Sequence, residues 1–182
     1  NTCNLECVMC NSINSSRIAA GQGINTRLID TGKIFEQIHD FLPYVKEMIF
    51  SGGEPFMSQI YFRIWEELIN VNPACKITLN TNATVINQRA KDIIEKGNFN
   101  FNISLDSVVK ETYEKIRVHS KFDTFIENFH YLCEYSKRKY VPVSAPVCPL
   151  IQNYKEIPNL ISFCNERNVH MVFLHVFGAH RV

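Results

Sequence analysis

The sequence has 182 residues, of which 46% are hydrophobic and 20% are charged, and its formal net charge is +1. This length fits one domain with a core of its own, and the composition excludes a disordered chain. Without a basic run there is no electrostatic case for nucleic-acid binding. No apolar stretch reaches the ~18 residues of a membrane span, so we expect neither nucleic acid nor a membrane as partner. The chain opens on polar residues and a cysteine cluster without Met, which predicts a fragment with no visible signal peptide.

From about residue 31, apolar residues at helical spacing alternate with short apolar runs that are typical of buried strands. The predicted helices cover 34–42, 60–69, 86–94, 111–138 in one or two pieces, and 157–164. The predicted strands cover 48–50, 77–79, 99–105, 141–147 and 169–177. This alternation predicts an α/β fold with right-handed crossovers and a parallel sheet. Five strands are too few for a closed eight-stranded barrel, which leaves an open partial barrel or a doubly wound sheet.

The strand at 99–105 distinguishes these two folds, because its side chains alternate between apolar and polar. Its polar residues, continued past the strand end, are Asn100, Asn102, Ser104 and Asp106. Thr78 and Asn80 repeat the pattern in the preceding strand. Both faces of a doubly wound sheet are covered by helices and should be apolar, so one polar face favours the partial barrel with a wet interior. Sites in parallel barrels lie at the carboxyl ends of the strands, here 52–55, 80–82, 104–106 and the region of His175.

Three of the seven cysteines, Cys3, Cys7 and Cys10, follow the spacing Cys-x3-Cys-x2-Cys. Thiolates are soft ligands that suit zinc, copper(I) or iron–sulfur clusters. Structural zinc needs four ligands, and the nearest candidates for a fourth, His39 and Cys75, lie in or beside predicted regular elements. Three thiolates in one loop therefore favour a cubane cluster with one open iron, with a zinc site or a disulfide between Cys7 and Cys10 as the alternatives. We interpret the scattered cysteines as small buried hydrophobes: Cys75, Cys133, Cys148 and Cys164.

The segment Cys3–Cys10 is followed, after the first predicted strand, by the motif Ser-Gly-Gly-Glu-Pro at 51–55. Together the two motifs resemble the radical S-adenosylmethionine (SAM) superfamily, most of all its branch of molybdopterin-biosynthesis, cofactor-peptide and sulfatase-maturation (SPASM-type) enzymes. Residues 104–117 resemble the family's fourth strand with its Arg-bearing helix, and 153–161 the helix before its sixth strand. The resemblance spans the chain. It implies that residues 1–182 form a radical SAM core domain with an open, TIM-like (β/α)6 partial barrel.

In such enzymes three thiolates hold a [4Fe–4S] cluster, which implies Cys3, Cys7 and Cys10 as its ligands here. SAM binds the open iron, and a reducing electron cleaves it to methionine and a 5′-deoxyadenosyl radical that abstracts hydrogen from the substrate. The resemblance therefore implies an enzyme that needs an electron donor such as flavodoxin or ferredoxin. It implies a peptide or small molecule as substrate without identifying it. We expect an oxygen-sensitive, cytoplasmic protein.

The resemblance assigns the amino-acid end of SAM to two parts of the chain. Gly52 and Gly53 lack Cβ atoms, so their backbone can approach a ligand closely. With Glu54, they would receive the methionyl amino group of SAM. Arg117 would bind the SAM carboxylate, for which a planar, two-pronged guanidinium is suited.

The remaining assignments concern the nucleoside end of SAM. The alternation described above points Ser104 and Asp106 into the barrel interior, and the resemblance implies that they contact the ribose or carboxylate. Asn80, on the neighbouring strand, would assist them. The residues implied beside the adenine are Met9, Val147 and Val176. His175, near the end of the last strand, fits a core or surface role better than a catalytic one.

The sequence also departs from the family pattern. The family's first barrel strand, which runs into the cysteine loop, is absent and would leave a sheet edge unpaired. A C-terminal cysteine-rich domain with auxiliary clusters is absent too. The usual Thr-Asn-Gly after the third strand is here Thr81-Asn82-Ala83. The rival functions are a non-enzymatic zinc-binding module and a scaffold that has lost its cluster.

Overall fold

Five parallel strands form one open sheet in the computed structural model, which describes residues 2–25 and 31–175. The strands are β1 (Glu47–Phe50), β2 (Lys76–Thr81), β3 (Phe99–Ile103), β4 (Val143–Val147) and β5 (His170–Phe173). They lie in the sheet in the order in which they occur along the chain, and every neighbouring pair is parallel. The sequence prediction of an open, all-parallel sheet is therefore confirmed.

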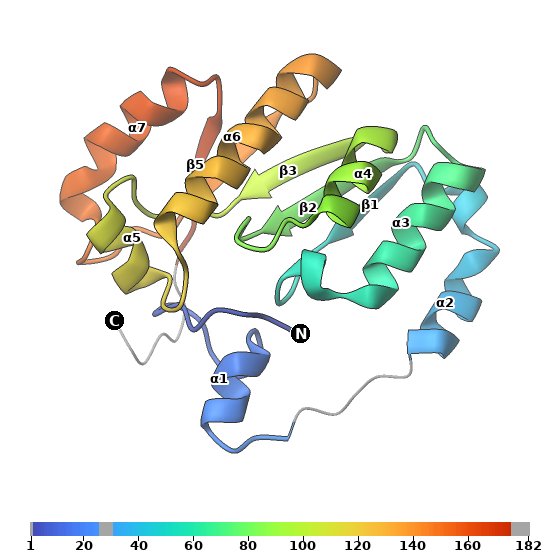
Figure 1. Ribbon diagram of the computed structural model, residues 1–182, viewed down its shortest axis with the longest axis horizontal. Coiled ribbons are helices and arrows are strands. Elements are labelled where there is room, and N and C mark those ends of the chain that lie inside the picture. The colour runs from blue at the N-terminus through green and yellow to red at the C-terminus, as the bar shows by residue number, and fades with distance from the viewer. Residues whose placement is uncertain (1, 26–30, 176–182) are drawn as a thin grey trace.

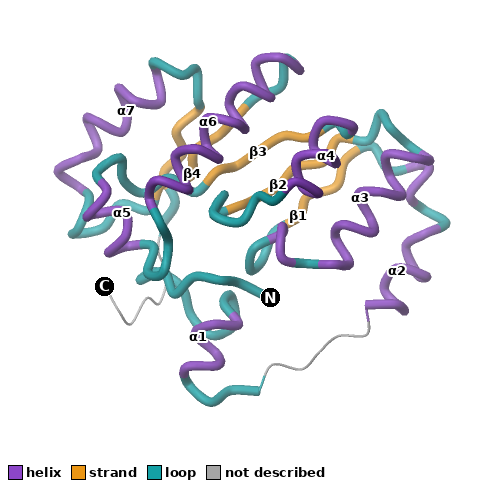
Figure 2. Tube along the Cα trace, in the orientation of Figure 1, coloured by secondary structure: helices purple, strands orange, loops and turns teal. Residues whose placement is uncertain are grey.

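Most of the α-helices lie over one side of this sheet, whereas the first lies apart from it beside the N-terminal segment, as Figures 1 and 2 show. They are α1 (Ser16–Gly21), α2 (Thr31–His39), α3 (Gln59–Val71), α4 (Gln88–Lys96), α5 (Lys110–Ile116), α6 (Phe122–Lys139) and α7 (Ile157–Asn165). Three short 3-10 helices add η1 (Leu42–Tyr44), η2 (Pro55–Met57) and η3 (Tyr154–Glu156). The helix predicted at 111–138 is thus two helices. In the part of the chain that the structure describes, no helix is both long and apolar enough to cross a membrane.

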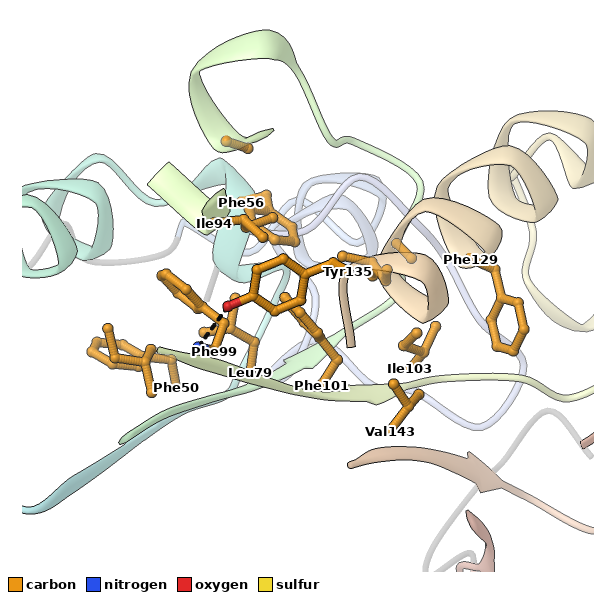
Figure 3. Packing of buried hydrophobic residues seen from close by; sticks show 14 of the residues in the cluster. Phe50, Phe56, Leu79, Ile94, Phe99, Phe101, Ile103, Phe129, Tyr135 and Val143 are labelled. Atoms are coloured by element: carbon orange, nitrogen blue, oxygen red, sulfur yellow. Dashed lines mark hydrogen bonds between the residues drawn. The ribbon is translucent and has the colours of Figure 1, made fainter. Parts of the chain in front are cut away.

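The core lies between the sheet and these helices and is rich in aromatic rings (Figure 3). Trp65 of α3 is fully buried, and the rings of Phe50, Phe56 and Phe99 meet it edge-on. Such edge-to-face contacts are favoured by the ring quadrupoles and add to the burial of apolar area. The buried rings fix the spacing between strands and helices, so the strand ends have defined positions.

The opposite face of the sheet is open and carries the polar side chains that the alternation in the sequence predicts, together with a few exposed apolar ones such as Ile49 and Val172. Asn80 of β2 is exposed and its Oδ1 accepts a hydrogen bond of 2.7 Å from Asn102 Nδ2 of β3. Ile49 of β1, on this same face, is 66% exposed, whereas the adjacent Phe50 is buried in the core. A sheet with helices on one face and polar side chains on the other is the arrangement of a partial barrel.

Candidate functional site

The cysteine segment crosses the carboxyl ends of the strands and is held by backbone hydrogen bonds at both sides. Glu6 N and Val8 N donate to the carbonyls of Val118 and Ile116 after α5, at 3.1 and 3.0 Å. On the other side, Glu54 N donates to Thr2 O at 2.7 Å. Figure 1 shows this N-terminal segment passing between α1 and α5. The segment therefore joins the loop after β1 to the end of α5.

The turn that carries the cysteines is stabilised by the helix that follows it. Ser15 is the N-cap of α1, where its Oγ accepts from Ile18 N and donates to Leu5 O at 2.7 Å. Ser16 Oγ accepts from Cys3 N at 3.0 Å. Serine is favoured at N-caps because its side chain satisfies a free helix N–H, and here the same hydroxyl also fixes the loop.

Cys3, Cys7 and Cys10 are brought together by this turn as free thiols. Cys10 N donates to Cys7 O at 2.9 Å, and Cys7 is 3% exposed. The Cys7 thiol donates to the Cys10 sulfur, which raises the pKa of Cys7 and lowers that of Cys10. Burial raises the pKa of Cys3. The predicted disulfide alternative is not what the structure contains.

Arg117, the C-cap of α5, reaches from the helix end to the cysteine turn. Its Nη1 lies 3.8 Å from Cys7 Sγ. Its Nε donates to Asp106 Oδ2 at 2.7 Å, its Nη2 lies 2.6 Å from the same oxygen as an ion pair, and Asp106 Oδ1 accepts from Cys148 N at 2.8 Å. The hydrogen bond with Cys10 and burial raise the pKa of Cys7, and the guanidinium opposes part of this rise, because a positive charge beside a sulfur favours the thiolate, the form that binds metal.

The prediction that Asp106 points into the open interior is wrong. The carboxylate is fully buried and bonded on both oxygens. Strand β3 ends at Ile103, so the alternation of side chains does not continue to Asp106, and the charge of Arg117 draws the carboxylate to the helix side. Ser104 does remain partly exposed, with its N–H donating to Thr81 O at 2.9 Å.

The loop after β1 presents backbone to the site while its acidic side chain faces inward. Gly52 and Gly53 have φ values of +87° and +64°, a conformation that glycine adopts without the cost other residues bear. Glu54 is 1% exposed, and its carboxylate accepts from Thr81 Oγ1 at 2.7 Å, Asn82 N at 2.7 Å and Phe56 N at 3.3 Å. Burial raises the pKa of Glu54 to about 7.

Asn82 falls in the strand-end range 80–82 that the sequence predicts for the site, but the sequence reasoning gave it no role of its own. It is 6% exposed, and its Nδ2 lies 3.1 Å from Asn4 Oδ1 and 4.0 Å from Cys3 Sγ. Asn80, which was predicted instead, lies on the open sheet face and bonds only to Asn102 among the hydrogen bonds of its side chain that the structure records. The signal for Asn82 was its place directly after the strand end, in Thr81-Asn82-Ala83.

The departure at Ala83 falls on a constrained backbone position. Ala83 has a φ of +54° and is fully buried. Its N–H donates to Thr81 Oγ1 at 2.9 Å and its carbonyl accepts from Asn128 Nδ2 at 2.8 Å. Left-handed backbone costs a non-glycine residue roughly 1–2 kcal/mol, so these two hydrogen bonds hold a turn that glycine would adopt freely.

The other predicted residues are distributed around this centre. Met9 is half-buried within the cysteine turn, and Val147 is fully buried at the end of β4, where its carbonyl accepts from Leu174 N at 2.8 Å. His175 is exposed after β5. Val176 lies outside the described residues.

The donor set decides between a cluster and zinc. Cys75 precedes β2 and so lies at the opposite end of the sheet from the cysteine turn, and His39 of α2 contacts Glu67 of α3. Neither is placed as a fourth ligand. Three thiols in one turn, with N–H groups of Arg117 and Asn82 at two of them, fit a thiolate-bound iron–sulfur cluster.

Comparisons with known proteins agree with this geometry. GTP 3′,8-cyclase of Petrotoga mobilis is 25% identical over 177 residues, which cover 94% of this chain and 52% of the cyclase. The chain spans about half the length of the curated relatives it matches. Among solved structures, SuiB of Streptococcus suis bound to S-adenosylmethionine has a TM-score of 0.73 at 18% identity, covering 99% of this chain and 40% of SuiB.

A third likeness is to the radical S-adenosylmethionine methyltransferase TsrM of Kitasatospora setae, with cobalamin and a [4Fe–4S] cluster bound. Its TM-score is 0.66 at 9% identity, covering 95% of this chain and 35% of TsrM. These two structural likenesses establish the fold. The family itself is established by sequence, because the family model of the Radical SAM superfamily matches residues 1–164. The chain belongs to the radical SAM superfamily.

Proposed function

We propose that this chain is the core of a radical SAM enzyme that abstracts a hydrogen atom from a peptide or small-molecule substrate. Family membership makes it an enzyme of radical SAM type, with a [4Fe–4S] cluster and SAM as cofactors. When bound, these cofactors supply the reductive cleavage of SAM to methionine and a 5′-deoxyadenosyl radical. The observation that carries the proposal is the turn that holds Cys3, Cys7 and Cys10, with Arg117 beside Cys7.

The protein's own part is to hold and orient these groups. Cys3, Cys7 and Cys10 would ligate the cluster and leave one iron for SAM. The backbone at Gly52 and Gly53 would meet the methionyl amino group, and Arg117 would bind the carboxylate. Because both oxygens of Glu54 already accept hydrogen bonds, we assign this residue to shaping the glycine loop.

The nucleoside end of SAM would extend over the strand ends. Ser104, which is partly exposed after β3, would meet the ribose or carboxylate. Met9 and Val147 would flank the adenine. We further propose that residues 1–182 are one core domain, that the enzyme works in the cytoplasm, and that flavodoxin or ferredoxin supplies the electron.

The proposal is tested by anaerobic reconstitution with iron and sulfide, followed by metal analysis. We expect about four irons per chain with matching sulfide. With dithionite and SAM, the reconstituted protein should release 5′-deoxyadenosine, which is measured by chromatography. Stoichiometric zinc without sulfide would contradict the proposal.

A pair of variants makes the test specific to the cysteine turn. Cys7→Ala should abolish both cluster binding and 5′-deoxyadenosine release. The control is Cys164→Ala, since Cys164 is an equally buried free thiol that lies on α7. We expect it to keep both. Release of 5′-deoxyadenosine by Cys7→Ala at the normal rate would show that this turn is not the radical source.

A further inference from the structure

The geometry points to Asp106 as the residue that positions Arg117 for SAM, with Asn153 holding Asp106 in place. This inference rests on the proposed function, because it assigns a role toward bound SAM. Its starting point is a buried ion pair: the side chain of Arg117 is 10% exposed and that of Asp106 is fully buried. Both lie at the carboxyl end of β3, next to the cysteine turn.

The guanidinium of Arg117 has five N–H groups, and two of them are hydrogen-bonded within the protein. Nε gives one to Asp106 Oδ2, Nη1 gives one to Cys7 Sγ, and Nη2 lies 2.6 Å from Asp106 Oδ2 as an ion pair. Among the described residues the structure records no other hydrogen bond from either Nη, so we assign one N–H group on each Nη to a ligand. A carboxylate accepts two parallel N–H donors well, so the remaining N–H groups of Arg117 suit the carboxylate of SAM.

Asp106 itself is not placed to contact SAM. Oδ2 accepts from Arg117 Nε and forms an ion pair with Nη2, and Oδ1 accepts from Cys148 N at 2.8 Å. A buried anion next to the SAM carboxylate would also repel it. The side chain therefore acts on SAM only through Arg117, which it orients and keeps charged.

Asn153 fixes the backbone that carries Asp106. It is fully buried, and its Nδ2 donates to Asp106 O at 2.8 Å and to Cys148 O at 3.0 Å. Its Oδ1 accepts from Leu150 N at 2.8 Å. One amide thus joins the loop after β3 to the loop after β4, so that the distance from Asp106 to Arg117 is set by both.

Replacing Asp106 by Asn gives a result whose sign separates two roles. The change removes a negative charge near the SAM carboxylate, so a purely electrostatic role predicts tighter SAM binding. A positioning role predicts weaker binding, because the guanidinium loses the partner that orients it. Outer-shell partners of this kind typically contribute about 10- to 100-fold to affinity or activity, and we expect a loss in that range.

The experiment uses reconstituted protein under anaerobic conditions. SAM affinity is measured by calorimetry and by the change that SAM causes in the electron paramagnetic resonance spectrum of the reduced cluster. We expect Asp106→Asn and Asn153→Ala to load iron, to bind SAM about 10- to 100-fold more weakly, and to raise KM for SAM more than they lower kcat. If Asp106→Asn does not fold, the Asn153→Ala variant provides the same test. It keeps the ion pair between Asp106 and Arg117 but removes the amide that fixes the backbone of Asp106.

Asn72→Ala is the matched control. Asn72 follows α3, where its amide donates to Leu42 O and Val45 O at 2.9 and 2.7 Å, far from the cysteine turn. It should lose stability and keep the SAM affinity of wild type. If an iron-loaded Asp106→Asn variant bound SAM as tightly as wild type or more tightly, the positioning role would be overturned and the proposed function would stand. Failure of the wild-type protein to bind a cluster would overturn the proposed function instead.

Discussion

Arg117 Nη1 lies 3.8 Å from Cys7 Sγ while the rest of the guanidinium is bonded to Asp106. The two residues are 110 positions apart in the chain, and their contact joins the cysteine turn to the end of α5. The same arginine therefore serves three groups: a thiol of the cluster site, a buried carboxylate and, in the proposed function, the SAM carboxylate. Stability and cofactor binding are coupled at this point.

Removing the charge of Arg117 should destabilise the fold strongly. In Arg117→Met, Asp106 would be left as a buried carboxylate without its ionic partner, which typically costs 3–5 kcal/mol, so we expect a loss of about that size. Urea unfolding of the metal-free protein under reducing conditions measures it. Arg138→Gln is the control, because the pair of Arg138 with Glu95 is about half exposed and should contribute at most ~1 kcal/mol. Equal losses in the two variants would contradict the prediction.

Glu54 should make the fold less stable as pH rises. Burial raises its pKa from 4.5 to about 7, so between these values the folded chain keeps a proton that the unfolded chain releases. The contribution of Glu54 to stability is therefore greatest below pH 4.5, falls through pH 5–7, and stays low above pH 7, with a full span of roughly 3 kcal/mol. Urea unfolding of wild type and Glu54→Gln at pH 5, 6, 7 and 8 isolates this slope. Parallel curves for the two proteins would show that Glu54 does not titrate in this way.

For two fully buried tyrosines, removing the hydroxyl should change the stability of the fold in different directions. Tyr135 Oη accepts from Phe99 N at 3.1 Å and donates to Gly97 O at 3.0 Å, the first of which Figure 3 draws. Tyr135→Phe leaves both buried groups unpaired and should cost about 1–3 kcal/mol. The Tyr113 hydroxyl is buried without a hydrogen-bond partner in the described structure, so Tyr113→Phe should be neutral or stabilising. Thermal unfolding compares the stability of the two variants. A larger loss of stability in Tyr113→Phe than in Tyr135→Phe would contradict the prediction.

Gly97 should not tolerate a methyl group. A Cβ there would lie 2.4 and 2.8 Å from Cε2 and Cδ2 of Phe99, whose ring is fully buried. Since the ring cannot move without disturbing the core, Gly97→Ala should cost about 1–3 kcal/mol in unfolding free energy. Gly21→Ala is the control, because nothing lies within 4 Å of its Cβ position. It should be neutral or slightly stabilising; a loss equal to that of Gly97→Ala would contradict the steric argument.

The sequence predicted the fold because local periodicity and topology agree throughout. Every predicted strand exists, and the alternation in 99–105 identified the one-sided sheet. The division of 111–138 into α5 and α6 was left open, since residues 117–121 carry no proline or glycine to mark the break. Such a break is set by tertiary contacts, here by Arg117 turning toward Asp106.

The site was predicted less completely, because loops beyond strand ends do not obey strand alternation. The three cysteines were found from their spacing, which a local turn enforces. Asp106 was misplaced by extending the alternation past Ile103. Asn80 was chosen for its place on the polar face of β2, whereas Asn82, which contacts Asn4, follows the end of that strand. Side chains in such loops turn toward whichever partner another segment supplies, and that information is not local.

Asn82 and Asn80 provide the last test of this distinction. Asn82→Ala removes the amide that bonds Asn4 Oδ1 and approaches Cys3 Sγ, and with it the acceptor for Thr84 N at 2.9 Å. The cysteine turn would keep the bond from Asn4 Nδ2 to Thr84 Oγ1 and lose its bond to Asn82, so its tie to the loop after β2 is weakened and amide hydrogen exchange in residues 3–7 should quicken in the metal-free protein. Iron binding should weaken, by about 10- to 100-fold if Asn82 acts as an outer-shell partner.

Asn80→Ala is the matched control, because it deletes the same group two residues earlier on the open face. It removes only the exposed hydrogen bond from Asn102 and should leave both exchange and iron binding at wild-type values. Iron content after dialysis against a graded chelator measures the difference between the two variants. If Asn80→Ala lost iron as readily as Asn82→Ala, the open sheet face would be part of the cluster site. If neither variant lost iron, the contact from Asn82 to Cys3 would not contribute to iron binding.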